Sequence, residues 1–202
     1  MTYELQCIIS GKSQVRYGTN IQAALSYLKT SEASGTLDKT DKHFKCQETE
    51  KLKQYIDSQN LWIKDIDLNN YVSEGAEQKV YLKDSRSVIK LNDAIYYLLW
   101  VDYFINLLLN NYFFPDTAYN LSGFFENENI VYAVVEQSFI NATEKTDLKH
   151  VEQFMNSNGF QKIRNNDYFN SELGIILEDL HDENVLTNNE ILYFIDTVFY
   201  LK

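Results

Sequence analysis

The most apolar stretch of the chain, residues 94–109, limits what this sequence can fold into. It is short for a membrane span and it contains Asp102 and Asn106, so it predicts a helix buried in a protein core. The pair Asn92 and Asp93 would cap its first turn, and we expect the helix to continue to about residue 111. The segments on either side of this helix must therefore cover it.

Short β runs separated by turn residues precede and follow the helix. The runs before it are 68–72, 79–82 and 87–91, and those after it are 121–125 and 129–135. A second helix is predicted over 146–158, followed by a strand at 175–177 and a terminal hairpin over 184–199. Strands, one buried helix, more strands and a small helical part with a hairpin together indicate the α+β class.

Residues 1–60 differ from the rest of the chain because helical patterns dominate there, at 21–28 and 48–58. We interpret them as an N-terminal helical extension. The boundary that follows the second pair of strands lies near Asn141, where the strand-rich part changes to a helical part. The predicted organisation is thus 1–60, 61–140 and 141–202.

The net charge and the cysteines indicate which binding partners and which cellular compartment to expect. A formal net charge of −11, without any run of Lys and Arg, argues against binding of nucleic acid through its phosphates. Cys7 and Cys46 lie far apart without a metal-binding or redox motif, which favours a reducing compartment. The N-terminus lacks the pattern of a signal peptide. We expect a soluble cytoplasmic protein that binds neither nucleic acid nor membrane.

The candidate catalytic and metal-binding residues are concentrated in the last 25 residues. Asp179 follows a buried strand, Asn184 comes five residues later, and a hairpin turning at 188–189 returns the chain to Asp196. Such an acid can accept a hydroxyl proton, while the amide and the second acid can hold Mg²⁺ against phosphates. His181 could orient Asp179 or contact phosphate. The alternative is that these residues only cap backbone groups.

Three further residues extend this hypothesis towards a nucleotide. Lys90 ends a predicted strand and would act as a point charge for phosphates. Asp102, the acid in the middle of the following helix, is the candidate partner that would hold this lysine. Gly75 lies in a turn that could approach phosphates, although such loops usually contain two or three glycines. The alternatives are a solvated lysine, a solvated helix acid and a bare turn.

Taken in order, these segments resemble the protein-kinase-like fold. Residues 75–81 correspond to the glycine-rich loop, 88–90 to the V-A-I-K strand, 136–138 to the hinge, 177–184 to the catalytic loop and 195–197 to the D-F-G segment. The chain is most similar to the kinase domain found in polyvalent proteins of phages and conjugative elements. Segments 75–81, 113–119, 123–124, 135–140 and 158–160 carry this resemblance together with the two acid motifs, over roughly residues 61–202.

The resemblance implies an antiparallel-sheet N-lobe over 61–140 with one long buried helix, and a minimal, truncated C-lobe over 141–202. It also implies ATP and Mg²⁺ as cofactors, with Lys90 on the α/β-phosphates and Asn184 with Asp196 on the metal. Asp179 would orient or deprotonate the acceptor hydroxyl. The backbone of Glu136, Gln137 and Ser138 would bind adenine.

Three departures from the family pattern leave the activity open. The glycine loop is depleted, an Asp stands where a kinase helix carries Glu, and only six residues follow Asp196. One hypothesis is a minimal Mg–ATP phosphotransferase with an unidentified hydroxyl acceptor, on a protein or a small molecule. The others are a nucleotide-binding pseudokinase or interaction module of a mobile genetic element, a purely structural domain, and nucleotidyl transfer with the triphosphate bound in reverse.

Overall fold

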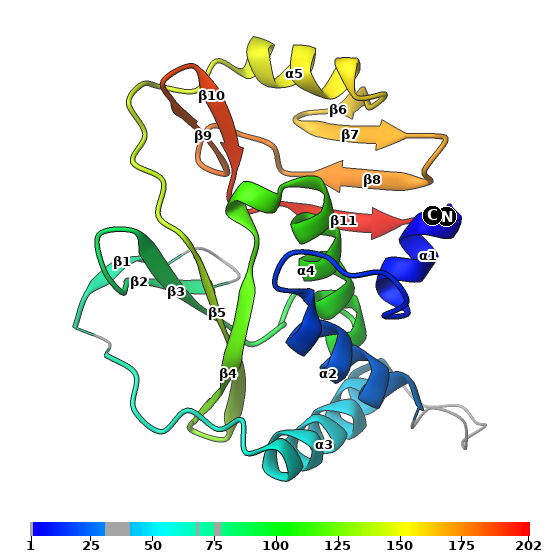
Figure 1. Cartoon of the computed structure of the whole chain (residues 1–202), viewed down its shortest axis with the longest axis vertical. Helices are drawn as coiled ribbons and strands as arrows, with labels where there is room; N and C mark the ends of the chain where they lie inside the picture. Colours follow the sequence, from blue (N-terminus) through cyan, green and yellow to red (C-terminus); the bar gives the residue numbers. More distant parts are fainter. Residues whose placement is uncertain (1, 31–40, 68, 75–77) are drawn as a thin grey trace.

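A five-stranded antiparallel sheet lies at the left of the molecule in Figure 1, and helices pack on one side of it. The computed structural model describes residues 2–30, 41–67, 69–74 and 78–202. The strand order is β1-β2-β3-β5-β4. The strands are β1 (Tyr71–Glu74), β2 (Gln78–Leu82), β3 (Ser87–Asn92), β4 (Asn120–Asn127) and β5 (Ile130–Ser138). Gly75 lies outside the described residues.

The part of the chain after β5 forms two smaller sheets that lie above the first in Figure 1. One has the order β11-β8-β7-β6, and the other is the hairpin β9–β10. The strands are β6 (Gln161–Arg164), β7 (Asp167–Asn170), β8 (Ile175–Glu178), β9 (Val185–Asn188), β10 (Ile191–Phe194) and β11 (Val198–Leu201). Helix α5 (Leu148–Ser157) precedes them, and Val151 and Met155 on its inner face are buried.

Apart from α5 and the long buried helix, the other helical elements of the described residues are α1 (Tyr3–Ile9), α2 (Gly18–Thr30), α3 (Asp41–Gln59) and the short 3₁₀ helix η1 (Pro115–Thr117). The helices predicted over 21–28 and 48–58 lie inside α2 and α3. The α+β prediction is confirmed as a mixed structure with antiparallel sheets. None of the helices in the described residues is long and apolar enough to cross a membrane.

The buried helix predicted from Asn92 is present, but it begins eight residues later, as α4 (Trp100–Phe113). Asn92 and Asp93 accept hydrogen bonds from the backbone N–H groups of Ala94 and Ile95, at 2.7 and 3.0 Å. Ala94 has a φ of +56°. Side-chain bonds of this kind close a turn instead of starting a helix, so the predicted N-cap was wrong.

Two carboxylates satisfy the true start of α4. Asp102 Oδ2 accepts a hydrogen bond from Leu99 N at 3.0 Å. Glu48, which reaches across from α3, accepts hydrogen bonds from the N–H groups of Trp100 and Val101. Negative charge at a helix N-terminus is favourable because it meets unpaired N–H groups and the positive end of the dipole. Helix α3 is therefore tied to the start of α4.

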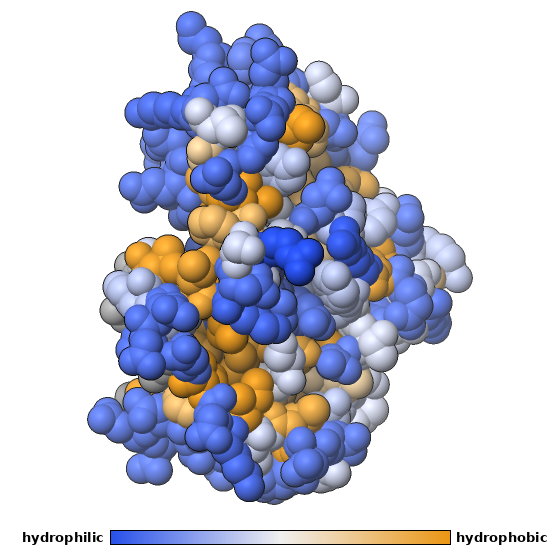
Figure 2. Space-filling model, turned by 60° about the vertical axis from the view of Figure 1, so that its left-hand side comes forward, coloured by the Kyte–Doolittle hydropathy of each residue, from blue (hydrophilic) through white to orange (hydrophobic). Residues whose placement is uncertain are grey.

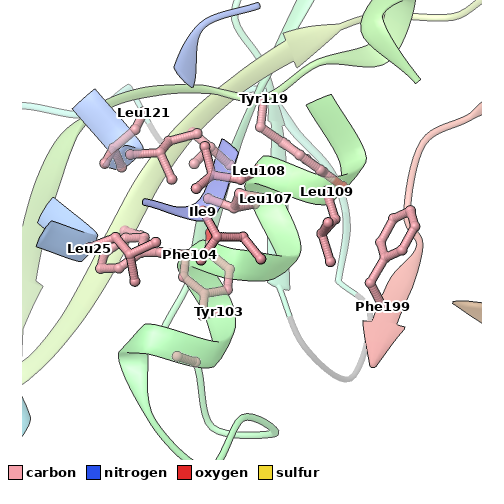
Figure 3. Packing of buried hydrophobic residues seen from close by; sticks show 14 of the residues in the cluster. Ile9, Leu25, Tyr103, Phe104, Leu107, Leu108, Leu109, Tyr119, Leu121 and Phe199 are labelled. Carbon is pink, nitrogen blue, oxygen red and sulfur yellow. The ribbon is translucent and has the colours of Figure 1, made fainter. Parts of the chain in front are cut away.

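The main hydrophobic cluster has α4 at its centre and joins α1, α2, α3, α5, β4 and β5 to strands of the two smaller sheets. A second, smaller cluster of Tyr81, Leu91 and Val134 lies on β2, β3 and β5. Figure 3 shows Phe104, Leu107, Leu108 and Leu109 of α4 surrounded by side chains from other parts of the chain, including Leu25 and Phe199. Phe104, Leu108 and Leu109 are fully buried. The apolar stretch noted in the sequence therefore organises the core, and it also holds the two groups of strands in place relative to each other.

Candidate functional site

A cavity of 510 Å³ lies between the five-stranded sheet and the β9–β10 hairpin. This volume is in the range of small-molecule sites. Its polar lining includes Lys90, Asn184, Asp196 and Gln78. Its apolar lining includes Val72, Val80 and Val88 from the sheet, Leu186 from β9, Phe139 and Ile140 from the segment after β5, and Ile195.

The space-filling view brings the side of the molecule with β1–β3 forward (Figure 2). Hydrophobic surface, in orange, lies at the notch on the left and continues down across the lower part, whereas the upper part is mostly hydrophilic. An apolar opening with a few polar groups is typical of small-molecule sites.

Asn184 and Asp196 meet at the base of the β9–β10 hairpin. Val185 pairs with Phe194, and Ile195 N donates a hydrogen bond to Asn184 O at 2.9 Å. Because antiparallel pairing places the two hairpin ends side by side, the amide and the acid both line the cavity. The sequence prediction that this hairpin returns Asp196 towards Asn184 is confirmed.

The loop before β9 holds Asp179 and Asn184 together. Asn184 Nδ2 donates hydrogen bonds to Asp179 Oδ2 and to Asp179 O, both at 3.0 Å. His181 Nε2 lies 3.2 Å from Asp179 Oδ1. The Asp179 side chain is 58% exposed, and its φ of +68° is uncommon for a residue other than glycine. An accessible carboxylate is thus presented beside the cavity, at the cost of a strained backbone.

This arrangement also orients the Asn184 amide. Its nitrogen faces the Asp179 carboxylate, an acceptor only, so its Oδ1 atom is left for another ligand. Within the described residues, no hydrogen bond involves Asn184 Oδ1, and Asp196 accepts one through Oδ2 only, from Gln78 Nε2 at 2.6 Å. Two oxygen donors therefore face the cavity.

The described residues contain no group of three or more His, Cys, Asp and Glu side chains that could hold a metal ion. Mg²⁺ does not need such a group, because it commonly binds one or two protein oxygens and completes its shell with phosphates and water. The oxygen donors of Asn184 and Asp196 fit that pattern.

Lys90 reaches the cavity from β3 and is 4% exposed. Its Nζ donates a hydrogen bond to Ile195 O at 2.8 Å and lies 5.4 Å from the centre of the Tyr119 ring. Burial lowers the pKa of the Lys90 ammonium, and the negative charge of Asp196 partly opposes this shift. A cation with little hydration, next to an acid, is well placed to attract phosphate oxygens.

Asp102 does not serve as the partner of Lys90, so this sequence prediction was wrong. Its carboxylate is bound at the start of α4. The reason is the late start of this helix: Asp102 falls in the first turn, where unpaired N–H groups attract it, and not in the middle. Lys90 is held instead by the carbonyl of Ile195 and the ring of Tyr119.

The residues predicted as a hinge belong to the end of β5. Gln137 and Ser138 line the cavity, together with the two residues that follow them. The Gln137 side chain is buried and donates to Thr117 O at 2.7 Å. Glu136 forms an ion pair with Lys83 at 2.7 Å and lines a separate polar hollow. Adenine binding by this segment stays a prediction.

Sequence reasoning missed the buried polar side chains around Asp196. These are Gln78, Asn106, Asn110, Thr117, Tyr119 and Thr197. A signal was present for two of them, because Asn106 and Asn110 recur at i and i+4 in an otherwise apolar helix. Buried amides must find hydrogen-bond partners, so their spacing predicts that a second segment crosses that face of the helix.

Replacing Lys90 by Met should stabilise the fold by about 1 kcal/mol at pH 7, because removing a buried charge also removes its desolvation cost. The pKa of Lys90 is lowered in the folded state. Below that pKa the lysine is charged, and the whole desolvation cost of the charge reduces stability. This cost disappears as the pH rises towards the unfolded value of about 10.4. The free energy of unfolding of the native chain, measured with urea at several pH values, should rise over that range, and that of Lys90→Met should lack this rise.

The control is Lys83→Met, which removes a half-exposed lysine from its ion pair with Glu136 and should change stability little. Ile195 O keeps a donor in Lys90→Met, because Tyr119 OH also bonds to it at 2.8 Å. A clear loss of stability in Lys90→Met would mean that the lysine hydrogen bond outweighs the cost of burial.

A scan against protein-family models matches residues 45–202 to the serine/threonine/tyrosine kinase found in polyvalent proteins. The match begins inside α3, sixteen residues before the start at residue 61 expected from the sequence. This earlier start agrees with the contacts between Glu48 of α3 and the start of α4. No curated protein and no solved structure matches the chain.

Proposed function

Because the chain belongs to the family of serine/threonine/tyrosine kinases found in polyvalent proteins, we propose that it transfers the γ-phosphoryl group of Mg–ATP to a hydroxyl group. The five-stranded sheet with α4 would be the N-lobe, and residues 141–202 a small C-lobe. One observation carries the proposal: a single cavity collects Lys90, Asn184 and Asp196, with the exposed acid Asp179 bonded to Asn184.

The nucleotide fits this cavity in one direction. Its adenine would lie between Val80 and Val88 on one side and Leu186 on the other, near the end of β5. Its phosphates would extend towards Lys90 and the base of the β9–β10 hairpin. This orientation places the apolar ring on apolar walls and the anionic tail on the buried cation.

Mg²⁺, when bound, would neutralise charge on the phosphates, and Asn184 with Asp196 would hold it through their oxygens. Lys90 would contact the phosphates as a point charge. The oxygen of the acceptor hydroxyl would form a bond to the γ-phosphorus while Asp179 takes the proton of that hydroxyl. The bond between the γ-phosphorus and the β–γ bridging oxygen would break, and ADP would leave. Positioning and electrostatics carry most of such a reaction.

A second candidate function is nucleotide binding without transfer. Two contacts favour it: Gln78 Nε2 bonds to Asp196 at 2.6 Å, and the Lys90 ammonium bonds to a carbonyl and not to a helix carboxylate. Both groups would have to exchange these partners for a metal and phosphates. A chain that binds Mg–ATP but phosphorylates no hydroxyl acceptor would fit this candidate.

Titration calorimetry with a non-hydrolysable ATP analogue, with and without Mg²⁺, tests the proposal. The native chain should bind more tightly with Mg²⁺. Val80→Trp should abolish binding, because an indole in place of a cavity-lining isopropyl group would fill the adenine space.

The matched control is Val15→Trp, the same change at a half-buried valine outside the cavity, which should bind as the native chain does. Absence of binding by the native chain at millimolar analogue would refute the proposal. Equal loss in both tryptophan variants would mean that the effect does not arise in the cavity.

A further inference from the structure

Buried polar groups from three other elements hold the segment on both sides of Asp196. On the side before the acid, Thr117 Oγ1 donates a hydrogen bond to Phe194 O. Ile195 O accepts two hydrogen bonds, from Lys90 Nζ and from Tyr119 OH, both at 2.8 Å. The peptide that leads into the acid is therefore fixed by β3 and by the segment after α4.

Helix α4 holds the side after the acid. Thr197 Oγ1 donates to Asn110 Oδ1 at 2.9 Å, and Phe199 N donates to Asn106 Oδ1 at 2.8 Å. Asn106 and Asn110 are one turn apart, so both amides face the same crossing segment. Asn110 is 0% exposed and Thr197 is 1% exposed, so water does not compete for their hydrogen bond.

The orientation of the Asn110 amide is also determined. Its Nδ2 donates to Thr117 O at 3.3 Å, which leaves Oδ1 for the Thr197 hydroxyl. Asn110 thus links Phe194, the last residue of β10, through Thr117 with Thr197, the residue directly after Asp196. With the backbone held on both sides, only the side-chain torsions of Asp196 stay adjustable, and Gln78 contacts one of its oxygens.

We propose that Asn110 is a positioning residue for Asp196, and that it acts through the hydroxyl of Thr197. Helix α4 would in this way place the metal-binding acid by a neutral hydrogen bond, while its own acid Asp102 serves the helix start. This inference rests on the proposed function, because it assigns Asp196 to the metal.

A merely structural Asn110–Thr197 pair would support the core without affecting the metal. The two roles differ in one measurable quantity, the gain in nucleotide affinity that Mg²⁺ produces. A structural role predicts equal effects on binding with and without the metal. A positioning role predicts loss of the metal-dependent part alone, since the adenine walls come from other residues.

The test compares Thr197→Val, which removes the hydroxyl at nearly constant shape, with Thr197→Ser, which keeps it. Calorimetry with the ATP analogue should show that Thr197→Val reduces the Mg²⁺-dependent gain in affinity by about tenfold or more, the usual effect of misplacing a metal ligand. Its affinity without metal should stay within about twofold of the native value. Thr197→Ser should retain the gain.

The matched control is Thr146→Val, which removes another buried threonine hydroxyl, paired with Thr187 at 2.9 Å and outside the cavity lining. It should leave the Mg²⁺-dependent gain unchanged. A full gain in Thr197→Val, or a lost gain in Thr197→Ser, would overturn the positioning role.

Hydrogen exchange of the ligand-free chain separates this inference from the proposed function. Amides of residues 194–199 should exchange faster in Thr197→Val than in the native chain, and unchanged in Thr146→Val. If the two variants show this pattern relative to the native chain, but the native chain binds no nucleotide, the proposed function fails and the linkage to α4 stands. Unchanged exchange in Thr197→Val overturns the linkage whatever the nucleotide result.

Discussion

Asp196→Asn should remove the Mg²⁺-dependent part of nucleotide binding and, with it, phosphoryl transfer. Asparagine keeps the size of the side chain and an oxygen that can still accept the hydrogen bond from Gln78, so the fold should persist. It lacks the negative charge, and the neutral oxygens of Asn184 and of the introduced asparagine would attract Mg²⁺ much less strongly than a carboxylate does. We expect the metal-dependent gain in affinity for an ATP analogue, measured by calorimetry, to fall by at least about tenfold.

The control for this substitution is Asp147→Asn. Asp147 caps α5 through a hydrogen bond from Lys149 N at 2.9 Å, and asparagine caps helices equally well. Binding with Mg²⁺ should therefore equal that of the native chain. If Asp196→Asn keeps the full metal-dependent gain, the metal is held elsewhere and the assignment of Asp196 is wrong.

Asp179→Asn should lower the rate of phosphoryl transfer by about 10²–10⁴ while nucleotide affinity stays unchanged. Asparagine tolerates the positive φ of this position, and its carbonyl oxygen can still accept the hydrogen bond from Asn184. Only the ability to accept a proton is removed. The measurement is single-turnover transfer from radiolabelled ATP to a panel of protein and small-molecule hydroxyl acceptors.

Asp182→Asn provides the comparison within the same loop. Asp182 forms an ion pair with Lys145 at 3.2 Å, and the hydrogen bond from Lys145 lowers the pKa of this carboxyl. Such a surface ion pair contributes little to the stability of the loop. The rate of phosphoryl transfer should therefore change by less than about threefold. Equal rates in the native chain and Asp179→Asn would show that this acid is not the base.

The C-terminal motif illustrates how much a sequence can reveal about a site. Asp179, Asn184 and Asp196 are separated by a short loop and a tight hairpin. Local turn geometry alone determines the distance between groups at the two ends of a hairpin. For this reason the sequence was sufficient to predict that the amide and the second acid meet. This motif also carried part of the resemblance to the kinase family, and the family match over residues 45–202 confirms that resemblance.

The start of α4 illustrates the opposite case. Asn92 and Asp93 are good caps in isolation, but they close a turn, and the helix begins where Glu48 of α3 supplies a carboxylate. Residues 48 and 100 are far apart in the sequence, so no local pattern could show this contact. The error then carried over to Asp102, whose predicted contact with Lys90 depended on where the helix began.

By itself, the sequence determined the mixed class, the buried helix and the hairpin that brings Asp196 to Asn184, because strand alternation, helix periodicity and hairpin turns are local properties. Only the tertiary structure decided which groups hold Lys90 and Asp196. Those contacts join β3, α4, η1 and the β10 end across the core. Buried polar groups form hydrogen bonds with whichever partner the packing brings within reach. The residues next to them in the sequence do not predict that partner.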